Sequence, residues 1–115
     1  MEVVRFSRAP HYSAPDHDEV VARRLQGGEA SPADFVLVGH STFAPGCGVP
    51  MDGGAPIGKV YIVTDGAITL EQADGARHVL GRGDSVYVAP GEARAVFNHT
   101  AESAGMIVIT PPAEK

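Results

Sequence analysis

Short runs in which apolar and polar residues alternate cover most of this chain, and such runs are typical of β-strands with one buried face. They recur at intervals of roughly 8–12 residues, the spacing of strands in sandwiches and small barrels. Asp65–Gly66 predicts a hairpin between residues 59–64 and 67–72, and Asp74–Gly75 predicts a second hairpin. The clearest strands are expected at residues 35–42, 59–64, 67–72, 77–80, 85–89, 94–98 and 105–110. The pattern predicts an all-β domain.

The first part of the chain has a weaker pattern. A short edge strand is expected within residues 3–6. Residues 16–27 fit two structures: Asp16 and Glu19 have the spacing of a helix capping box, whereas the β-branched residues between them and Gly27 fit an irregular strand. The sequence thus predicts an N-terminal arm over residues 1–34, with a short helix or edge strands packing on a barrel over residues 35–112.

Residues 44–58 hold five glycines and three prolines, so we expect a long loop without regular structure. Loops of this length in compact domains often carry function. No Gly-Lys-Ser/Thr sequence follows, which argues against a phosphate loop. Cys47 lies in this segment without an evident base in the sequence, and we interpret it as an incidental thiol.

Charge and composition exclude several functions. The 115 residues include 14 Asp and Glu against 9 Lys and Arg, a net charge of -5, which disfavours nucleic acid as a partner. A single cysteine excludes an internal disulfide and a multi-cysteine zinc site. No apolar run approaches the roughly 18 residues that span a bilayer, and no signal peptide is evident. We therefore expect a cytoplasmic protein that binds no membrane.

Two segments keep a glycine spacing that resembles the paired motifs of the cupin superfamily. Residues 46–66 read GCGVPMDGGAPIGKVYIVTDG, and residues 83–98 read GDSVYVAPGEARAVFN. The resemblance implies a single jelly-roll β-barrel of short antiparallel strands. It also implies a homodimer, as small cupins commonly pair, and the apolar strands near both ends of the chain point the same way.

The family's metal-ligand positions are altered in this chain. Where the motifs carry three histidines and a glutamate, this sequence has Asp52, Gly54, Lys59 and Arg94. Charged lysine and arginine cannot ligate a metal and repel a divalent ion. We therefore expect no metal and no other cofactor. The alternative is a metal site with relocated ligands drawn from His40, Asp52 and His78.

The motif positions predict a cavity with two cations. Because side chains alternate along a strand, Tyr61 shares the inward face of Lys59, and Asn98 shares that of Arg94. A lysine in a low-dielectric cavity beside an arginine has its charged form disfavoured, which suits it to act as an acid or base. Lys59 is therefore the predicted catalytic group and Tyr61 a proton donor, while Arg94 is expected to bind the substrate's anionic group.

Two further residues complete the predicted catalytic set. Asp52 is expected at the barrel mouth as an auxiliary group, and His40 as an acid or base if it projects into the barrel. Asn98 is a candidate for binding the substrate.

Each of these residues also has a structural interpretation. In the structural interpretation, Lys59 forms an ion pair with Asp52, and Arg94 pairs at the surface with Glu92 or Asp84. Tyr61 and His40 are core side chains, and Asn98 caps a turn.

The sequence therefore favours a metal-independent isomerase, lyase or hydratase that acts on a small anionic organic molecule, such as a carboxylate or sugar acid. Two alternatives stay open. One is a non-catalytic module that binds or senses a small anion, and the other is a metal-dependent cupin with relocated ligands.

Overall fold

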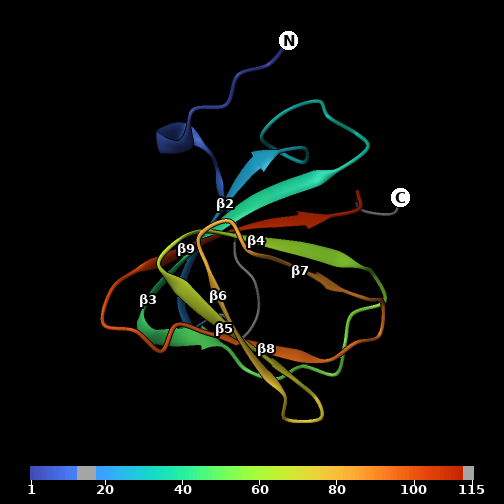
Figure 1. Ribbon diagram of the computed structural model, residues 1–115. Coiled ribbons are helices and arrows are strands. Elements are labelled where there is room, and N and C mark those ends of the chain that lie inside the picture. The colour runs from blue at the N-terminus through green and yellow to red at the C-terminus, as the bar shows by residue number, and fades with distance from the viewer. Residues whose placement is uncertain (13–17, 113–115) are drawn as a thin grey trace.

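The computed structural model describes residues 1–12 and 18–112, which form nine strands and one short 3-10 helix (Figure 1). Within these residues, no helix is long and apolar enough to cross a membrane. The elements are η1 (Phe6–Arg8), β1 (His11–Tyr12), β2 (Asp18–Gln26), β3 (Leu37–Val49), β4 (Lys59–Asp65), β5 (Ala67–Gln72), β6 (Arg77–Gly81), β7 (Ser85–Val88), β8 (Arg94–Phe97) and β9 (Ala104–Thr110).

Strand β3 joins two walls of a barrel. One wall holds β5, β6, β8 and the end of β3, and the other holds β1, β2, the first part of β3, β9, β4 and β7. Its first part, Leu37 to Phe43, pairs with β9, and its last residues, Gly48 and Val49, pair with β8. The hydrogen-bonded order is β6-β5-β8-β3-β9-β4-β7, with β2 and then β1 added beside β3, and every pairing is antiparallel. The predicted all-β barrel is confirmed.

Two sequence predictions about the middle of the chain are wrong. The turn at Asp65–Gly66 does not close a hairpin, because β4 pairs with β7 and β9 whereas β5 pairs with β6 and β8. The chain crosses there from one wall to the other. Residues 44–49 are not loop but the end of β3, where Gly48 lies so close to β8 that a Cβ would meet the Val96 carbonyl oxygen. A glycine is needed at position 48 because the β3 and β8 backbones approach closely there, and not because the chain turns.

The N-terminal arm forms strands. Residues 18–26 are β2, which pairs with β3 along most of its length, so the structure selects the strand over the helix for this segment. Asp16 lies outside the described residues. The edge strand expected within residues 3–6 is absent: residues 1–5 have no regular structure, and η1 begins at Phe6.

The core lies between the two walls. Its most buried side chains come from β3, β4, β5 and β8, and they include Phe43, Val63, Ile68 and Val96. The β4 burial alternates, with Tyr61 and Val63 buried and their neighbours partly exposed. This alternation turns one face of β4 inward along its whole length, and Lys59 lies on that face.

Candidate functional site

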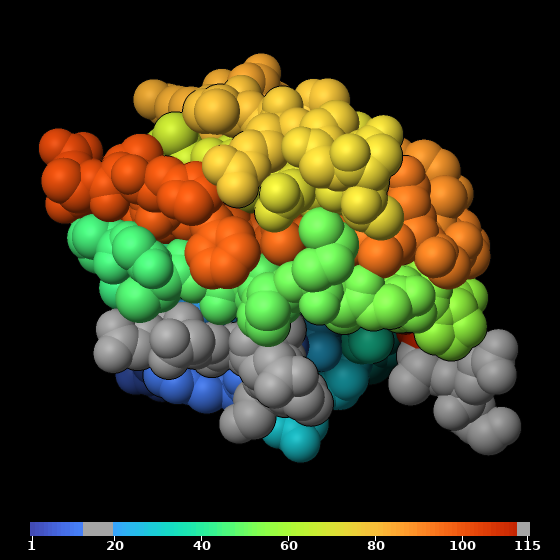
Figure 2. Space-filling model, turned by 90° about the horizontal axis from the view of Figure 1, so that it is seen from below, coloured from blue at the N-terminus to red at the C-terminus, as the bar shows by residue number. Residues whose placement is uncertain are grey.

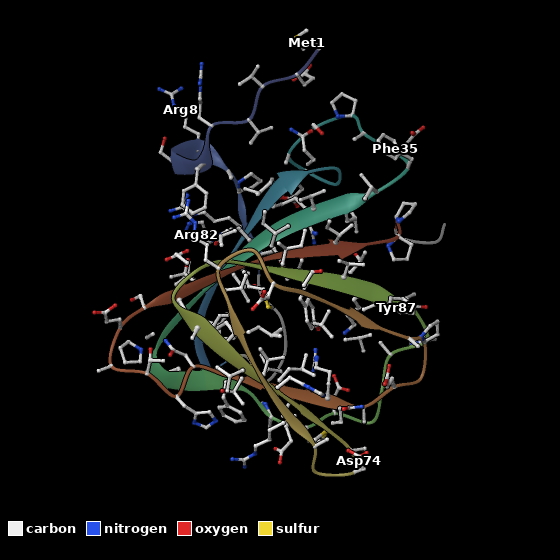
Figure 3. The ribbon with its side chains drawn as sticks, viewed as in Figure 1. Met1, Arg8, Phe35, Asp74, Arg82 and Tyr87 are labelled. Atoms are coloured by element: carbon white, nitrogen blue, oxygen red, sulfur yellow. The ribbon has the colours of Figure 1, made fainter. Side chains whose placement is uncertain are left out.

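A cavity of about 200 Å³ opens into the barrel beside the core. Figure 3 shows the side chains that the walls direct inward, while the labelled Asp74 and Tyr87 lie at the periphery. The cavity is lined by Tyr12, Arg24, Ser41, Phe43, Val49, Ile57, Lys59, Tyr61, Arg94, Val96, Met106, Val108 and Thr110. Three of these, Lys59, Tyr61 and Arg94, are residues that the sequence predicted to share a cavity.

Arg94 is the centre of a buried polar network. Its Nε donates a hydrogen bond to the Tyr61 hydroxyl at 2.8 Å, and its Nη1 donates to Asp52 Oδ2 at 2.8 Å. The Arg94 side chain is 7% exposed and that of Asp52 43%, so the ion pair reaches from the interior to the surface. Seen from below, the green glycine-rich segment that carries Asp52 runs alongside the orange residues of β8 (Figure 2).

The surface pairing considered for Arg94 is therefore wrong. Glu92 accepts a hydrogen bond from the Ala89 amide, and Asp84 accepts one from the Gly81 amide. Both carboxylates stabilise turns, whereas Arg94 points inward from β8. The structure also shows no Lys59–Asp52 ion pair among the described residues, and the Asp52 carboxylate binds the Arg94 guanidinium and the Gly54 amide instead.

Lys59 stands in this cavity without a partner. It makes no hydrogen bond or ion pair with any residue in the part of the chain that the structure describes. Burial lowers the pKa of Lys59, the positive charge of Arg94 lowers it further, and Asp52 partly opposes both effects. The neutral amine, which has a free electron pair, is thereby favoured relative to an exposed lysine.

The Tyr61 hydroxyl accepts a hydrogen bond from Arg94 and donates none to the described residues. Burial raises the pKa of Tyr61, while the adjacent Arg94 acts in the opposite direction through its charge and its hydrogen bond. The phenol therefore stays protonated at neutral pH. Because the oxygen accepts from Arg94, its own O–H can donate to a molecule in the cavity.

His40 does not project into the barrel, so its predicted role as a barrel acid or base is wrong. Ser41 and Phe43 on β3 line the cavity, and strand alternation places His40 on the opposite face. There its ring packs edge-on against Phe6 at 5.1 Å, and its Nε2 lies 3.3 Å from the Thr64 hydroxyl. Burial lowers the pKa of His40.

Asn98 is a structural residue, and its predicted contact with substrate is wrong. It is fully buried at the end of β8 and does not line the cavity. Its Nδ2 donates to the carbonyl oxygens of Phe43 and Glu102, and its Oδ1 accepts from the Thr100 amide and hydroxyl. The side chain thus fixes the loop before β9 against β3.

Tyr12 and Arg24 also line the cavity, and sequence reasoning missed them. Both lie in the N-terminal arm, outside the two motifs. Their position depends on β1 and β2 pairing beside β3, where Arg24 lies opposite Gly39. A pair of adjacent arginines in an ambiguous segment carries no signal of which one faces the cavity.

Removing the charge of Asp52 tests the network. We expect Asp52→Asn to destabilise the protein by about 1–2 kcal/mol, since Arg94 stays buried with a neutral partner and the half-exposed pair is screened by water. We also expect the pKa of Lys59 to fall further, because Asp52 raises it. Only two lysines, Lys59 and Lys115, occur in the chain, so ¹³C-lysine NMR resolves this titration. The exposed Asp34→Asn is the charge control; an unchanged or raised Lys59 pKa would contradict the network.

The fold and this cavity define a cupin. Residues 39–110 match the family model of the cupin domain, and the chain belongs to that family. A protein named β-D-galactosidase from Mycobacterium tuberculosis is 42% identical over 108 residues, covering 94% of this chain and 91% of that protein.

Solved structures share the same barrel. The polyketide cyclase RemF from Streptomyces resistomycificus has a TM-score of 0.85 and 18% identity over 96% of this chain and 79% of that chain. A cupin 2 conserved barrel domain protein from Salinispora arenicola has a TM-score of 0.76 and 27% identity over 98% of this chain and 90% of that chain. These matches confirm the predicted cupin-type jelly roll.

The residues at the family's metal-ligand positions do not fit a metal ion. Arg94 is a permanent cation bonded to Asp52 and Tyr61, and its positive charge lies in the same cavity as Lys59. Within residues 1–12 and 18–112, no group of three His, Cys, Asp or Glu side chains is placed to hold a metal. The relocated set is also dispersed, since His78 Nε2 lies 2.7 Å from Gln72 Oε1 and His40 lies outside the barrel.

Proposed function

We propose that this cupin is an enzyme that transfers a proton on a small sugar or sugar acid bound in the barrel cavity, with Lys59 as the base. The observation that carries the proposal is the Lys59 amine in the cavity, which has no partner among the described residues and whose pKa is lowered by burial and by Arg94. A base whose pKa approaches the working pH is more effective in general-base catalysis.

The remaining residues supply the electrophilic side of the reaction. Lys59 Nζ would remove a proton from a carbon next to a carbonyl, and the electron pair would move to the carbonyl oxygen. Tyr61 is oriented to donate its O–H to that oxygen, because Arg94 occupies its acceptor side. Return of the proton to the neighbouring carbon gives an isomer, and loss of a leaving group there gives a lyase reaction.

The relative named β-D-galactosidase supports a sugar as the ligand class, since it is 42% identical over nearly the whole chain. Two-carboxylate hydrolysis of a glycoside is not what these side chains offer. Among the described residues, no Asp or Glu lines the cavity, and the nearby Asp52 is bound to Arg94. The cavity volume of about 200 Å³ suits one small molecule.

Exchange of a substrate C–H with solvent tests the proposal. We expect the protein in D₂O to replace the C2 proton of D-galacturonate or D-galactose with deuterium, observed as loss of its ¹H NMR signal. Saturable binding without exchange would instead make the protein a binding or sensing module. A stoichiometric metal in untagged protein, with activity lost on its removal, would overturn the metal-independent reaction.

The pH dependence follows from the direction of the Lys59 shift. Only the neutral amine can accept a proton, so we expect kcat/KM to rise with pH through the pKa of Lys59 and then to level off. Burial and Arg94 place that midpoint below the ordinary lysine value of 10.5. Initial rates measured across neutral and mildly alkaline pH check this, and a rate that falls over the same range would argue against Lys59 as the base.

A further inference from the structure

Arg24 and Tyr12 form a stacked pair in the lining of the cavity that also contains Lys59. The Arg24 guanidinium carbon lies 4.2 Å from the centre of the Tyr12 ring, a cation–π contact. Tyr12 pairs with Ala22 across β1 and β2, which makes Arg24 its diagonal neighbour on the same face. The two side chains therefore hold each other in place.

Gly39 makes room for this pair. It lies opposite Arg24 on β3, and a Cβ at this position would lie 2.6 Å from the Tyr12 hydroxyl oxygen. The Tyr12 ring thus rests on the backbone of β3, on the face that carries Ser41 into the cavity. A side chain at Gly39 would displace the ring from that face.

The Arg24 guanidinium has donors to spare. Its side chain makes no hydrogen bond or ion pair with any residue within the described ranges, although it lies partly buried against Tyr12. Arg94 differs, because its Nε and Nη1 are both occupied. Among the described residues, Arg24, the Lys59 amine and the Tyr61 hydroxyl therefore offer donors to a molecule in the cavity, and Arg94 Nη2 adds a further one.

Arg24 on β2 and Lys59 on β4 lie in the same wall of the barrel, far enough apart to hold the two ends of a small ligand. Strands β3 and β9 separate β2 from β4, so the β2 and β4 backbones lie roughly 14 Å apart along the sheet. The charges that shift the pKa of Lys59 are those of Arg94 and Asp52, and Arg24 is not among them. An anionic group held at Arg24 would leave the far end of the ligand at Lys59.

A second cavity, on the other side of Arg24 and Tyr12, has a carboxylate side chain in its lining. Arg24 and Tyr12 also line this outer space, together with Glu29. The negative charge of Glu29 disfavours an anion there. The barrel side, with Lys59 and Arg94, favours one.

We infer that Arg24, held by Tyr12, binds the carboxylate of the substrate, so that this cupin selects a sugar acid over the neutral sugar. This inference rests on the proposed function and adds the substrate's charge class and its orientation. The planar guanidinium presents parallel N–H donors that match the two oxygens of a carboxylate. Arg94 stays a second candidate for anion binding, but its charge is already paired with Asp52, whereas Arg24 has no described ion-pair partner.

Binding of two matched sugars tests the inference. D-galacturonate and D-galactose differ at C6, where one carries a carboxylate and the other a hydroxymethyl group. We expect calorimetry to show D-galacturonate binding at least about tenfold more tightly to the wild type. In Arg24→Met, which keeps the apolar stem, we expect the preference to fall to within about twofold. A wild type with no preference, or an Arg24→Met variant that keeps it, would overturn the inference.

Control variants separate this result from other effects. Arg23→Met removes the neighbouring arginine, which donates to the Phe6 carbonyl oxygen on the other face, and should keep the preference. Tyr12→Phe should keep it and Tyr12→Leu weaken it, which provides a test if Arg24→Met folds poorly. Calorimetry measures binding without turnover, so its result does not depend on proton transfer by Lys59. The preference for D-galacturonate can therefore be observed even if Lys59 transfers no proton. Proton transfer can likewise be observed even if Arg24 does not set the preference.

Discussion

Lys59→Met is expected to lose proton-transfer activity by about 10²–10⁴-fold, the usual contribution of a general base. Methionine has a similar length and fills the same part of the cavity, but it has no amine to accept a proton. The deuterium-exchange assay measures the loss. Lys115→Met, which removes the other lysine, is the control and should keep full activity. Unchanged exchange by Lys59→Met would remove Lys59 from the mechanism.

The same substitution is expected to raise the thermal unfolding temperature by a few degrees at neutral pH. The pKa of Lys59 is lower in the folded protein than in the unfolded chain, so folding opposes protonation of the amine. The cost is complete below the folded pKa and disappears as pH rises towards the unfolded value. The gain in Lys59→Met should therefore shrink as pH is raised. A gain that grows with pH would contradict a half-buried amine that has no partner among the described residues.

Asn98→Ala is expected to destabilise the protein by about 2–4 kcal/mol without affecting the cavity chemistry of the protein that remains folded. Alanine leaves the carbonyl oxygens of Phe43 and Glu102 and the amide of Thr100 without the partner that Asn98 provides. Because Asn98 is 0% exposed, water cannot readily replace these bonds. Urea unfolding measures the change.

A matched variant separates the acceptor role of the Asn98 side chain from its donor role. Asn98→Asp keeps the oxygen that accepts from Thr100 but removes the two amide donors, and it adds a buried negative charge. We expect it to be at least as destabilising as alanine at neutral pH and to recover as pH falls, since protonation restores a donor. A stability equal to wild type in either variant would contradict the structural role.

Local sequence rules located most strands because apolar alternation and turn pairs act over a few residues. They failed at Asp65–Gly66, where a turn signal cannot show which strand lies beside which. They failed at residues 44–49 because glycine permits close packing as readily as a turn, and only the neighbouring β8 backbone decides between the two.

The site was predictable where motif spacing applied and not elsewhere. Lys59, Tyr61 and Arg94 fall at fixed positions in a known barrel, so their convergence followed from the sequence. The face of His40 did not, since a shift of one residue along a strand reverses every side chain. Arg24 is adjacent to Arg23, and the pairing of β2 with β3 alone decides which of them enters the cavity.

By itself, the sequence determined an all-β cupin barrel whose motif places a lysine and an arginine where the family's motif has metal ligands. Glycine spacing and strand alternation are local properties, and they are sufficient for that conclusion. The tertiary structure alone decided how these charges are used. Asp52 binds Arg94, Lys59 is left without a described partner, and the N-terminal strands bring Arg24 into the lining of the same cavity. These pairings join residues far apart in the chain, and only the folded backbone sets the distances on which charges act.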